Sequence, residues 1–168
     1  MWLSHNKKPF SYSNALKVNV SRAVVNIAIG NNLNYKVIDP CCGIGTVLIE
    51  ALSMGIDIIG YEINPSIGYN AIRNLNYFGY ENIITIGDMT SIEDIYDIAI
   101  IDLPYGIFTQ ITAQEQLDII LSGRRIAKKL ILITFEDMET QIKACGFNIE
   151  DRCTISKGNF IRHISICI

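Results

Sequence analysis

The chain has 168 residues, of which 49% are hydrophobic and 18% are charged, a composition typical of one globular domain. We therefore expect a single domain over residues 1–168, with residues 1–30 forming an N-terminal segment and helix before the main fold. The 14 basic and 17 acidic side chains give a net charge of −3, which excludes a protein that coats nucleic acid through a general positive field. A nucleic-acid partner would have to meet a local basic patch.

The cysteines and histidines are too few and too scattered for a disulfide framework or a zinc site. Five cysteines are present, of which Cys41 and Cys42 are adjacent, and there are only two histidines. The N-terminal residues lack the apolar core of a signal peptide, and no apolar run reaches the length of a membrane span. The sequence thus predicts a cytoplasmic chain with reduced thiols, no membrane segment and no bound metal.

Helical and strand patterns alternate along the chain. A first helix is predicted within residues 15–30, where apolar residues recur at helical spacing until Gly30. Short β-branched runs predict strands, whose apolar character is typical of parallel strands covered on both faces, at 35–39, 57–61, 82–86, 97–102 and 130–135. Further helices are predicted near 45–54, 65–78, 113–128 and 137–145.

Local signals mark several boundaries of these elements. Asn64 is placed as an N-cap, Pro65 as the first helical residue, and Gly79 as the end of that helix. Residues 148–155 and 160–168 are two more strands, joined by the turn sequence SKGN. The order predicts an α/β fold with a doubly wound, mostly parallel seven-stranded sheet and an antiparallel C-terminal hairpin.

Ligands of such sheets bind beyond the carboxyl ends of the strands, so we looked for a site there. The first strand ends at Asp39 and continues into a turn with Gly43 and Gly45, where a ligand can approach bare backbone. Glu62 ends the second strand and is placed to accept hydrogen bonds from both hydroxyls of a ribose.

The third strand end completes a predicted nucleoside site. Asp88 could accept a hydrogen bond from the exocyclic amine of an adenine, with Ile63 and Met89 as apolar walls for its ring. Leu48 stands where a dinucleotide fingerprint has its third glycine, which argues against a pyrophosphate and against an NAD-dependent reductase. Asp39 would repel phosphate but can hold an ammonium group, and S-adenosylmethionine carries one.

The fourth strand end, Asp102-Leu103-Pro104-Tyr105-Gly106, suggests a reaction. The lone pair of an exocyclic amine is delocalised into its base. If the Asp102 carboxylate and the Leu103 carbonyl each accept one N–H, that lone pair turns toward a sulfonium methyl for in-line displacement. Pro104 would hold Leu103 extended, and Tyr105 could stack on an unpaired base.

These motifs resemble the class I S-adenosylmethionine-dependent methyltransferases, and more narrowly their amine-modifying branch. Its fourth-strand signature is Asp or Asn, Pro, Pro, then Tyr or Phe. The likeness is greatest to the THUMP-associated group that methylates guanosine amines in tRNA and large-subunit rRNA, and it covers about residues 8–135. The segments that carry it are KPFSYSNALKVNVSRAVVNIA, DPCCGIGTVLIEA, GYEINPSIGYNAIRNLNYFG and DLPYG.

The resemblance implies a Rossmann-like fold, a cofactor and site residues. Cofactor-lining positions would be Asp39, Cys41, Gly43, Gly45, Glu62, Asp88 and Asp102, with Phe10 beside the cofactor. Asp102, Leu103, Pro104 and Tyr105 would hold the target amine, although Leu103 replaces the first proline of the signature. The RNA-binding module that usually accompanies this domain is not found in these residues, so a separate RNA-recognition subunit is one way of capturing substrate.

The predicted function is methyl transfer from S-adenosylmethionine to an exocyclic amine, with guanosine in tRNA or rRNA as the expected substrate. One alternative is methylation of a DNA adenine or of a protein glutamine, since these present a similar amine or amide nitrogen. Another is an inactive partner subunit that binds the cofactor, which the substituted proline and the missing RNA module would favour.

Several of these features also have ordinary structural explanations. The glycine turn could be a plain strand-to-helix connection, and Tyr105 an ordinary aromatic residue of the core or surface. Cys41 and Cys42 are interpreted as packing residues, not nucleophiles. His5 and His163 are interpreted as solvated or in ordinary hydrogen bonds, without an acid–base role. The row Asn70, Arg73 and Asn74 fits the exposed side of a helix, with substrate contact as the alternative. Solvated faces are expected at Arg124, Arg125, Lys128 and Lys129. Lys7 and Lys8 are either a solvated face or the flank of a nucleic-acid groove.

Overall fold

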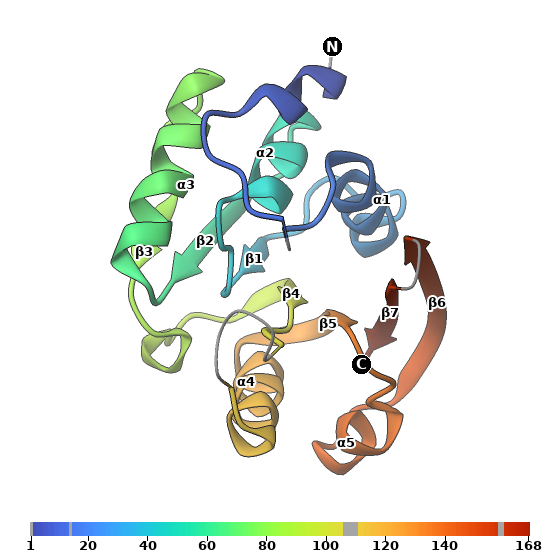
Figure 1. The fold of residues 1–168 in the computed structure, drawn as a ribbon. Helices are drawn as coiled ribbons and strands as arrows, with labels where there is room; N and C mark the ends of the chain where they lie inside the picture. The colour runs from blue at the N-terminus through green and yellow to red at the C-terminus, as the bar shows by residue number, and fades with distance from the viewer. Residues whose placement is uncertain (1, 14, 106–110, 158–159) are drawn as a thin grey trace.

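The computed structural model describes residues 2–13, 15–105, 111–157 and 160–168. Within them, one seven-stranded sheet has the order β3-β2-β1-β4-β5-β7-β6 (Figure 1). Its strands are β1 (Val37–Asp39), β2 (Ile58–Glu62), β3 (Ile84–Ile86), β4 (Tyr96–Asp102), β5 (Ala127–Thr134), β6 (Ile149–Lys157) and β7 (Phe160–Cys167). Strand β7 pairs antiparallel with β5 and β6, whereas the pairs among β1 to β5 are parallel, so the predicted fold class is confirmed.

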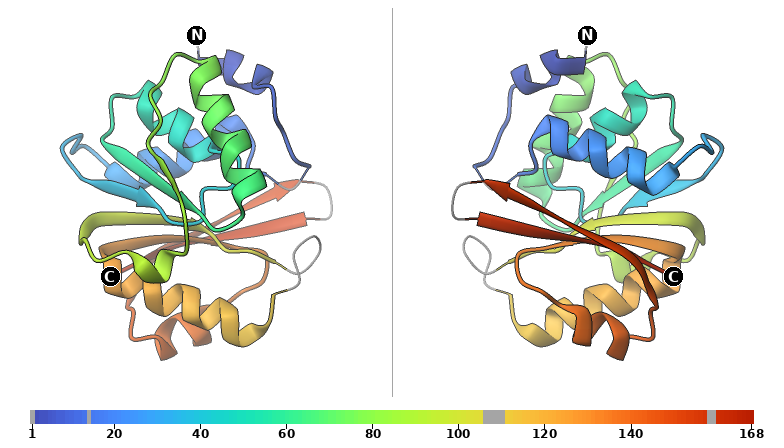
Figure 2. Two further views of the ribbon diagram at one scale, coloured as in Figure 1. Left: turned by 90° about the vertical axis from the view of Figure 1, so that its left-hand side faces the viewer. Right: turned by 90° about the vertical axis from the view of Figure 1, so that its right-hand side faces the viewer.

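Helices cover both faces of the sheet. They are α1 (Val18–Ile29), α2 (Thr46–Ser53), α3 (Pro65–Tyr77), α4 (Ala113–Ile126) and α5 (Glu139–Ala144), with 3-10 turns η1 (Trp2–Lys7) and η2 (Met89–Ser91). Figure 2 shows α1, α2 and α3 on one side and α4 and α5 on the other. Neighbouring strand residues such as Ile100 and Ile101 are both buried, in two different hydrophobic clusters, because successive side chains point to opposite faces.

The start of α3 is set by local chemistry, as predicted. The Asn64 side chain accepts hydrogen bonds from the backbone N–H groups of Ser66 and Ile67, and Pro65 occupies the first turn. These contacts satisfy amide groups that have no partner within the helix. Gly79 follows the end of the helix with a φ of 78°, a left-handed conformation that glycine adopts without strain.

Two predicted helices have different bounds in the structure. The first helix begins at Val18, later than expected. The helix predicted over 113–128 ends at Ile126, because strand β5 begins at Ala127 and pairs with β4 along its length. Lys128 and Lys129 therefore lie on a strand: Lys128 Nζ is 2.9 Å from a carboxylate oxygen of Asp97, and Lys129 donates to the carbonyl of Ala28. Lys128 is exposed, as expected for a solvated face, and Lys129 is half-buried, but both lie on β5 and not on the predicted helix.

Some predicted features fall outside what the structure describes. Gly106 of the fourth-strand motif and the turn residues Gly158 and Asn159 lie outside the described residues. Within the part of the chain that is described, no helix combines the length and the apolar character needed to cross a membrane.

Candidate active site

The acidic residues predicted at the strand ends meet at one edge of the sheet. Asp39 is paired in register with Gly60 of β2, two residues before Glu62, and Asp102 ends the adjacent strand β4. Cys41, in the loop after β1, reports their proximity, since the charges of four carboxylates act on it. Burial is the main cause of the raised pKa of the Cys41 thiol. The pKa is raised further by the negative charges of the four carboxylates, Asp39, Glu62, Asp88 and Asp102. The thiol is therefore held protonated, in keeping with a packing role.

The loop between β1 and α2 is folded around two glycines. Gly43 and Gly45 have φ values of 54° and 79°, which side chains with a Cβ rarely adopt. A Cβ added at Gly43 would meet no heavy atom within 4 Å, so the backbone borders open space there. Helix α2 packs closely on strand β2, because a Cβ at Gly60 of β2 would lie only 2.6 Å from the Leu48 side chain. The glycine that allows this close packing is therefore on β2, whereas α2 has Leu48 where the dinucleotide fingerprint has a glycine.

Glu62 is held in place by backbone amides on both of its oxygens. Gly43 N–H donates to Oε2 at 2.9 Å, and Asn64 N–H donates to Oε1 at 2.8 Å. Burial raises the pKa of Glu62, while these two hydrogen bonds lower it. A carboxylate has about four acceptor positions, so the two amides leave others for hydroxyl donors.

Asp39 is buried with much weaker compensation. Its side chain accepts one hydrogen bond from Cys41 N–H, at 3.3 Å, and the residue is 4% exposed. Burial raises the pKa of Asp39 well above its usual range, and the nearby charges of Asp102 and Glu62 raise it further. A cation bound against this carboxyl would favour its ionised form and so offset the effects of burial and of the neighbouring charges.

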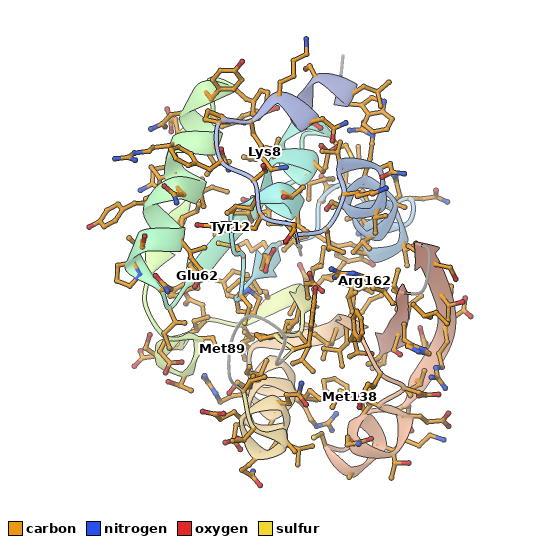
Figure 3. All side chains as sticks on the ribbon, viewed as in Figure 1. Lys8, Tyr12, Glu62, Met89, Met138 and Arg162 are labelled. Carbon is orange, nitrogen blue, oxygen red and sulfur yellow. The ribbon has the colours of Figure 1, made fainter. Side chains whose placement is uncertain are left out.

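The third strand end carries polar and apolar groups side by side. Asp88 is exposed and caps η2 by accepting a hydrogen bond from Thr90 N–H at 2.9 Å. Met89 is 5% exposed, with its sulfur 3.9 Å from the Cys41 sulfur, while Ile63 is 67% exposed. Figure 3 shows Tyr12, Glu62, Met89 and Arg162 around the ends of the central strands.

Arg125 has a structural role that sequence reasoning missed. Its guanidinium donates to the carbonyls of Met89, Thr90 and Ile92, which holds η2 against α4. Arg124 lies over the Phe147 ring, with 5.2 Å between the guanidinium carbon and the ring centroid. The two arginines are therefore not simply a solvated face.

The peptide after Asp102 is fixed without the first proline of the usual signature. Leu103 N–H donates to the carbonyl of Ile133 at 2.9 Å, and its side chain is buried. The carbonyl of Pro104 accepts a hydrogen bond from the Gln116 side chain at 3.0 Å. A proline at position 103 could not donate to Ile133, so this chain replaces ring rigidity with an extra sheet hydrogen bond.

Asp102 has a partner that the sequence did not indicate. Arg162 Nη1 lies 2.7 and 2.9 Å from the two Asp102 oxygens, and Nη2 donates to the Tyr105 hydroxyl at 3.1 Å. Tyr105 also stacks on Phe135, with 4.8 Å between ring centroids and 22° between ring planes. Burial raises the pKa of Asp102 to about 6, although the Arg162 charge and hydrogen bonds act in the opposite direction.

The N-terminal segment is attached to the glycine loop through Asn74. Phe10 exchanges two backbone hydrogen bonds of 3.0 Å with the Asn74 amide, which also donates to the carbonyl of Ile44. Asn74 is fully buried, so its assignment to the exposed side of a helix was wrong. Its neighbours on α3 also contact this segment: Asn70 donates to the Tyr12 hydroxyl, and Arg73 lies over the Phe10 ring.

His5 belongs to a second buried polar cluster, away from the strand ends. Its Nδ1 lies 2.5 Å from Glu50 Oε1, and Arg22 donates to Glu50 Oε2 at 3.1 Å. Of the two expectations for His5, solvated or in ordinary hydrogen bonds, the structure shows the second: His5 is buried, and its contact with Glu50 helps to anchor η1. Lys7 is exposed and Lys8 is half-buried, which lowers the pKa of Lys8. Whether they flank a nucleic-acid groove stays a prediction.

Among the residues that the structure describes, no three His, Cys, Asp or Glu side chains are grouped so as to hold a metal ion. The donors at the strand ends are instead those suited to a nucleoside with a cationic group. They are carboxylates for hydroxyls and ammonium, apolar side chains for a ring, and open backbone at Gly43.

Comparison with known proteins identifies related sequences. A family model, UPF0020, described as "RMKL-like, methyltransferase domain", matches residues 5–120. The tRNA (guanine(10)-N2)-dimethyltransferase of Pyrococcus abyssi is 30% identical over 134 residues, which are 71% of this chain and 40% of that protein. The enzyme of the same name from Methanothermobacter thermautotrophicus is 30% identical over 105 residues, 61% of this chain and 31% of that protein. The chain thus spans less than half the length of these relatives.

Solved structures share the fold at low sequence identity. The magnesium protoporphyrin IX methyltransferase of Synechocystis PCC 6803, solved with bound SAM, has a TM-score of 0.73 at 18% identity, covering 98% of this chain and 90% of that one. The Pyrococcus abyssi tRNA (uracil-54, C5)-methyltransferase, in complex with S-adenosyl-L-homocysteine, has a TM-score of 0.68 at 13% identity, covering 89% and 37%. At such identities the likeness establishes the fold.

Proposed function

This chain belongs to the UPF0020 family of RMKL-like methyltransferase domains, and we propose that it methylates the exocyclic amine of a guanosine in tRNA, with S-adenosylmethionine as methyl donor. The observation that carries the proposal is the position of Asp102-Leu103-Pro104-Tyr105 at the end of β4, beside the edge where Asp39 and Glu62 meet. The names of the two curated relatives support guanosine and tRNA.

The donor set at the ends of β1, β2 and β3 suits each part of this cofactor. Glu62, already oriented by two amides, would accept the ribose hydroxyls, and Asp39 would hold the ammonium group. Asp88 would accept from the adenine amine, with Ile63 and Met89 against the ring. Gly43, Gly45 and Cys41 would form the wall of the site, and Phe10 would lie beside it. When bound, the cofactor supplies an electrophilic methyl group on a sulfonium.

The end of β4 would prepare the nitrogen that attacks this methyl group. Asp102 and the Leu103 carbonyl would each accept one N–H, which turns the lone pair away from conjugation with the ring. Leu103 is positioned for this by its hydrogen bond to Ile133, and Pro104 holds it in an extended conformation. A nitrogen–carbon bond would form as the carbon–sulfur bond breaks, the electron pair of the broken bond would stay on the sulfur of the leaving S-adenosylhomocysteine, and the alkylated nitrogen would release its proton to solvent.

Tyr105 would stack on the target base. Its ring plane is fixed by Phe135, so the base would meet an ordered aromatic side chain, and such stacking contributes about 1–3 kcal/mol. RNA capture would involve residues beyond this domain, either in a separate subunit or in segments corresponding to the rest of the longer relatives. Exposed Lys7 and half-buried Lys8, next to Phe10, would contact phosphates at the edge of the site.

Cofactor binding is tested by calorimetry with S-adenosylhomocysteine, with NAD as the control ligand. We expect saturable one-to-one binding of S-adenosylhomocysteine and none of NAD. Methyl transfer is tested with tritiated S-adenosylmethionine and total RNA, DNA or protein, followed by mass spectrometry of the nucleosides. Label in DNA or protein in place of RNA would overturn the guanosine assignment, and binding without any transfer would favour an inactive partner subunit.

The catalytic assignment is tested with Asp102→Ala. We expect transfer to fall by about 100-fold or more, because the variant loses an acceptor that orients the amine. Asp97→Ala is the matched control, since Asp97 lies at the other end of the same strand and pairs with Lys128. Equal activity of the two variants would contradict the role of Asp102.

A further inference from the structure

Arg162 reaches from one strand to another across the strand between them. It lies on β7, which is separated from β4 by β5, yet it contacts both oxygens of Asp102. Asp102 is paired in register with Ile133, and Ile133 with Ile164, so their side chains share one face of the sheet. Arg162 is two residues from Ile164 on β7 and therefore points to the same face.

We propose that Arg162 is a positioning residue for the amine site, which keeps the Asp102 carboxylate charged and fixes its orientation and that of the Tyr105 ring. The inference rests on the proposed function, because that function assigns the target amine to Asp102. Arg162 would act through Asp102 and Tyr105 and would not itself touch the transferred methyl group.

Burial and a nearby carboxylate both disfavour the ionised form of Asp102. The charge of Asp102 acts on Asp39, at the end of the neighbouring strand β1, so the two carboxyl groups repel each other when both are ionised. Cys41 from the loop after β1 and Tyr105 from the end of β4 are neutral in their usual state, and β5 contributes the apolar Ile133. Among the residues that the structure describes, Arg162 from β7 is the cation that forms an ion pair with this carboxylate. The ionised carboxylate is acceptor-only on both oxygens, whereas the protonated group carries an O–H donor on one of them.

The hydrogen bonds of Arg162 fix the orientation of the Asp102 carboxylate. One nitrogen, Nη1, bridges both carboxylate oxygens, and the other, Nη2, donates to the Tyr105 hydroxyl. The guanidinium carbon also lies 5.5 Å from the centroid of the Tyr105 ring. A rigid, planar guanidinium thus sets the carboxylate relative to the ring on which the base would stack. The remaining acceptor positions of the carboxylate stay available for an N–H of the substrate.

A titration that needs no activity tests the charge role directly. The carboxyl carbons of aspartate are labelled with ¹³C, and the Asp102 resonance is identified as the one that Asp102→Asn removes. We expect a midpoint near pH 6 in the wild type, and a midpoint higher by about one unit or more in Arg162→Gln and Arg162→Met. Arg162→Lys should stay close to the wild type. An unchanged midpoint in both neutral variants would overturn the inference, and using two of them guards against one failing to fold.

Kinetics as a function of pH test the consequence for transfer. In the wild type, activity should fall as the pH is lowered through about 6, because Asp102 becomes protonated. In Arg162→Gln this acidic limb should move to higher pH, with recovery in more basic buffer. Arg162→Lys should keep the wild-type limb but reach a lower plateau, since it loses the bridge to Tyr105. Arg152→Gln is the matched control, because Arg152 lies on β6 of the same hairpin and pairs with Asp137 and Glu139, away from Asp102.

The outcomes separate the two proposals. If the chain transfers no methyl group to any substrate, the proposed function fails, while the titration still decides whether Arg162 keeps Asp102 charged. If Arg162→Gln shows the wild-type pH profile and plateau, this inference fails and the proposed function stands.

Discussion

In the described part of the chain, buried carboxylates at the Glu50 cluster and at the strand ends differ in how their charges are compensated. Glu50 on α2 is fully buried, with His5 on one oxygen and Arg22 on the other, and Arg22 also donates to Ser53. At the strand ends, Asp39 is almost as buried, but among the described residues its side chain accepts one 3.3 Å hydrogen bond. The Glu50 cluster is complete in itself, whereas the strand ends keep acceptors for a ligand.

The difference is the one expected between a cluster that supports the fold and a site that binds a ligand. The Glu50 cluster joins η1, α1 and α2, and so stabilises the side of the fold that supports the glycine loop. Poor compensation is reflected in the pKa of Asp39, which burial raises well above its usual range, and burial raises the pKa of Asp102 as well although Arg162 acts against it. Ionisable groups shifted in this way are frequent at binding and catalytic sites.

The largest expected effect on the free energy of unfolding is that of Glu50→Ala. Removing one partner of a buried ion pair leaves the others uncompensated, so the free energy of unfolding should fall by about 3 kcal/mol. Urea unfolding measures this, and S-adenosylhomocysteine affinity should hardly change at a temperature where the variant is folded. A variant that kept its stability but lost ligand binding would reverse the distinction between the two sites.

For Glu62→Ala we expect a loss of ligand affinity with little loss of stability. The loss of two charged hydrogen bonds to the ribose should weaken S-adenosylhomocysteine binding by about 2 to 4 kcal/mol. Calorimetry under the conditions used for Glu50→Ala checks this, with thermal unfolding to confirm the fold. An affinity within about threefold of the wild type would show that the ribose is not held at the end of β2.

Asp39 should make ligand binding depend on pH. Its folded-state pKa is raised, so the carboxyl is protonated over a wider pH range than in the unfolded chain. A bound ammonium group favours the ionised form, so affinity should weaken as the pH falls through the raised pKa, by up to about tenfold per unit. Calorimetry in two buffers of different ionisation enthalpy should detect proton release on binding, and Asp39→Asn should abolish it.

The same shift has a consequence for the ligand-free protein. Because the folded-state pKa lies above the unfolded one, the stability associated with Asp39 is present at low pH and lost as the pH rises through the raised pKa. Asp39→Asn should therefore stabilise the free protein more in basic than in acidic buffer. Urea unfolding in both buffers measures the difference, and a gain of equal size in the two would contradict it.

The smallest expected effect is that of Ser53→Ala. The hydroxyl accepts from Arg22 at 3.0 Å and donates to the carbonyl of Glu50 at 2.7 Å. Its loss should lower the free energy of unfolding by about 1 kcal/mol, without a measurable change in ligand affinity. A change in affinity with no change in stability would indicate that the two sites are coupled.

Local features were predictable because short stretches of chain determine them. The α3 start at Asn64 and Pro65, the glycine turn after β1 and the acids that follow the strands all depend on neighbours in sequence. The carboxyl ends of parallel strands must meet at one edge, so the convergence of Asp39, Glu62 and Asp102 could be expected once the strands were recognised. Their roles in binding and transfer remain predictions that the experiments above test.

By itself, the sequence determined the alternation of strands and helices and the chemistry available at each strand end, since periodicity and turn residues act over a few positions. Only the tertiary structure decided which distant side chains complete that chemistry. Arg162 meets Asp102 because β7 inserts antiparallel beside β5, and Asn74 is buried because the N-terminal segment folds across α3. Such contacts join residues about 60 positions apart, and no local pattern encodes them.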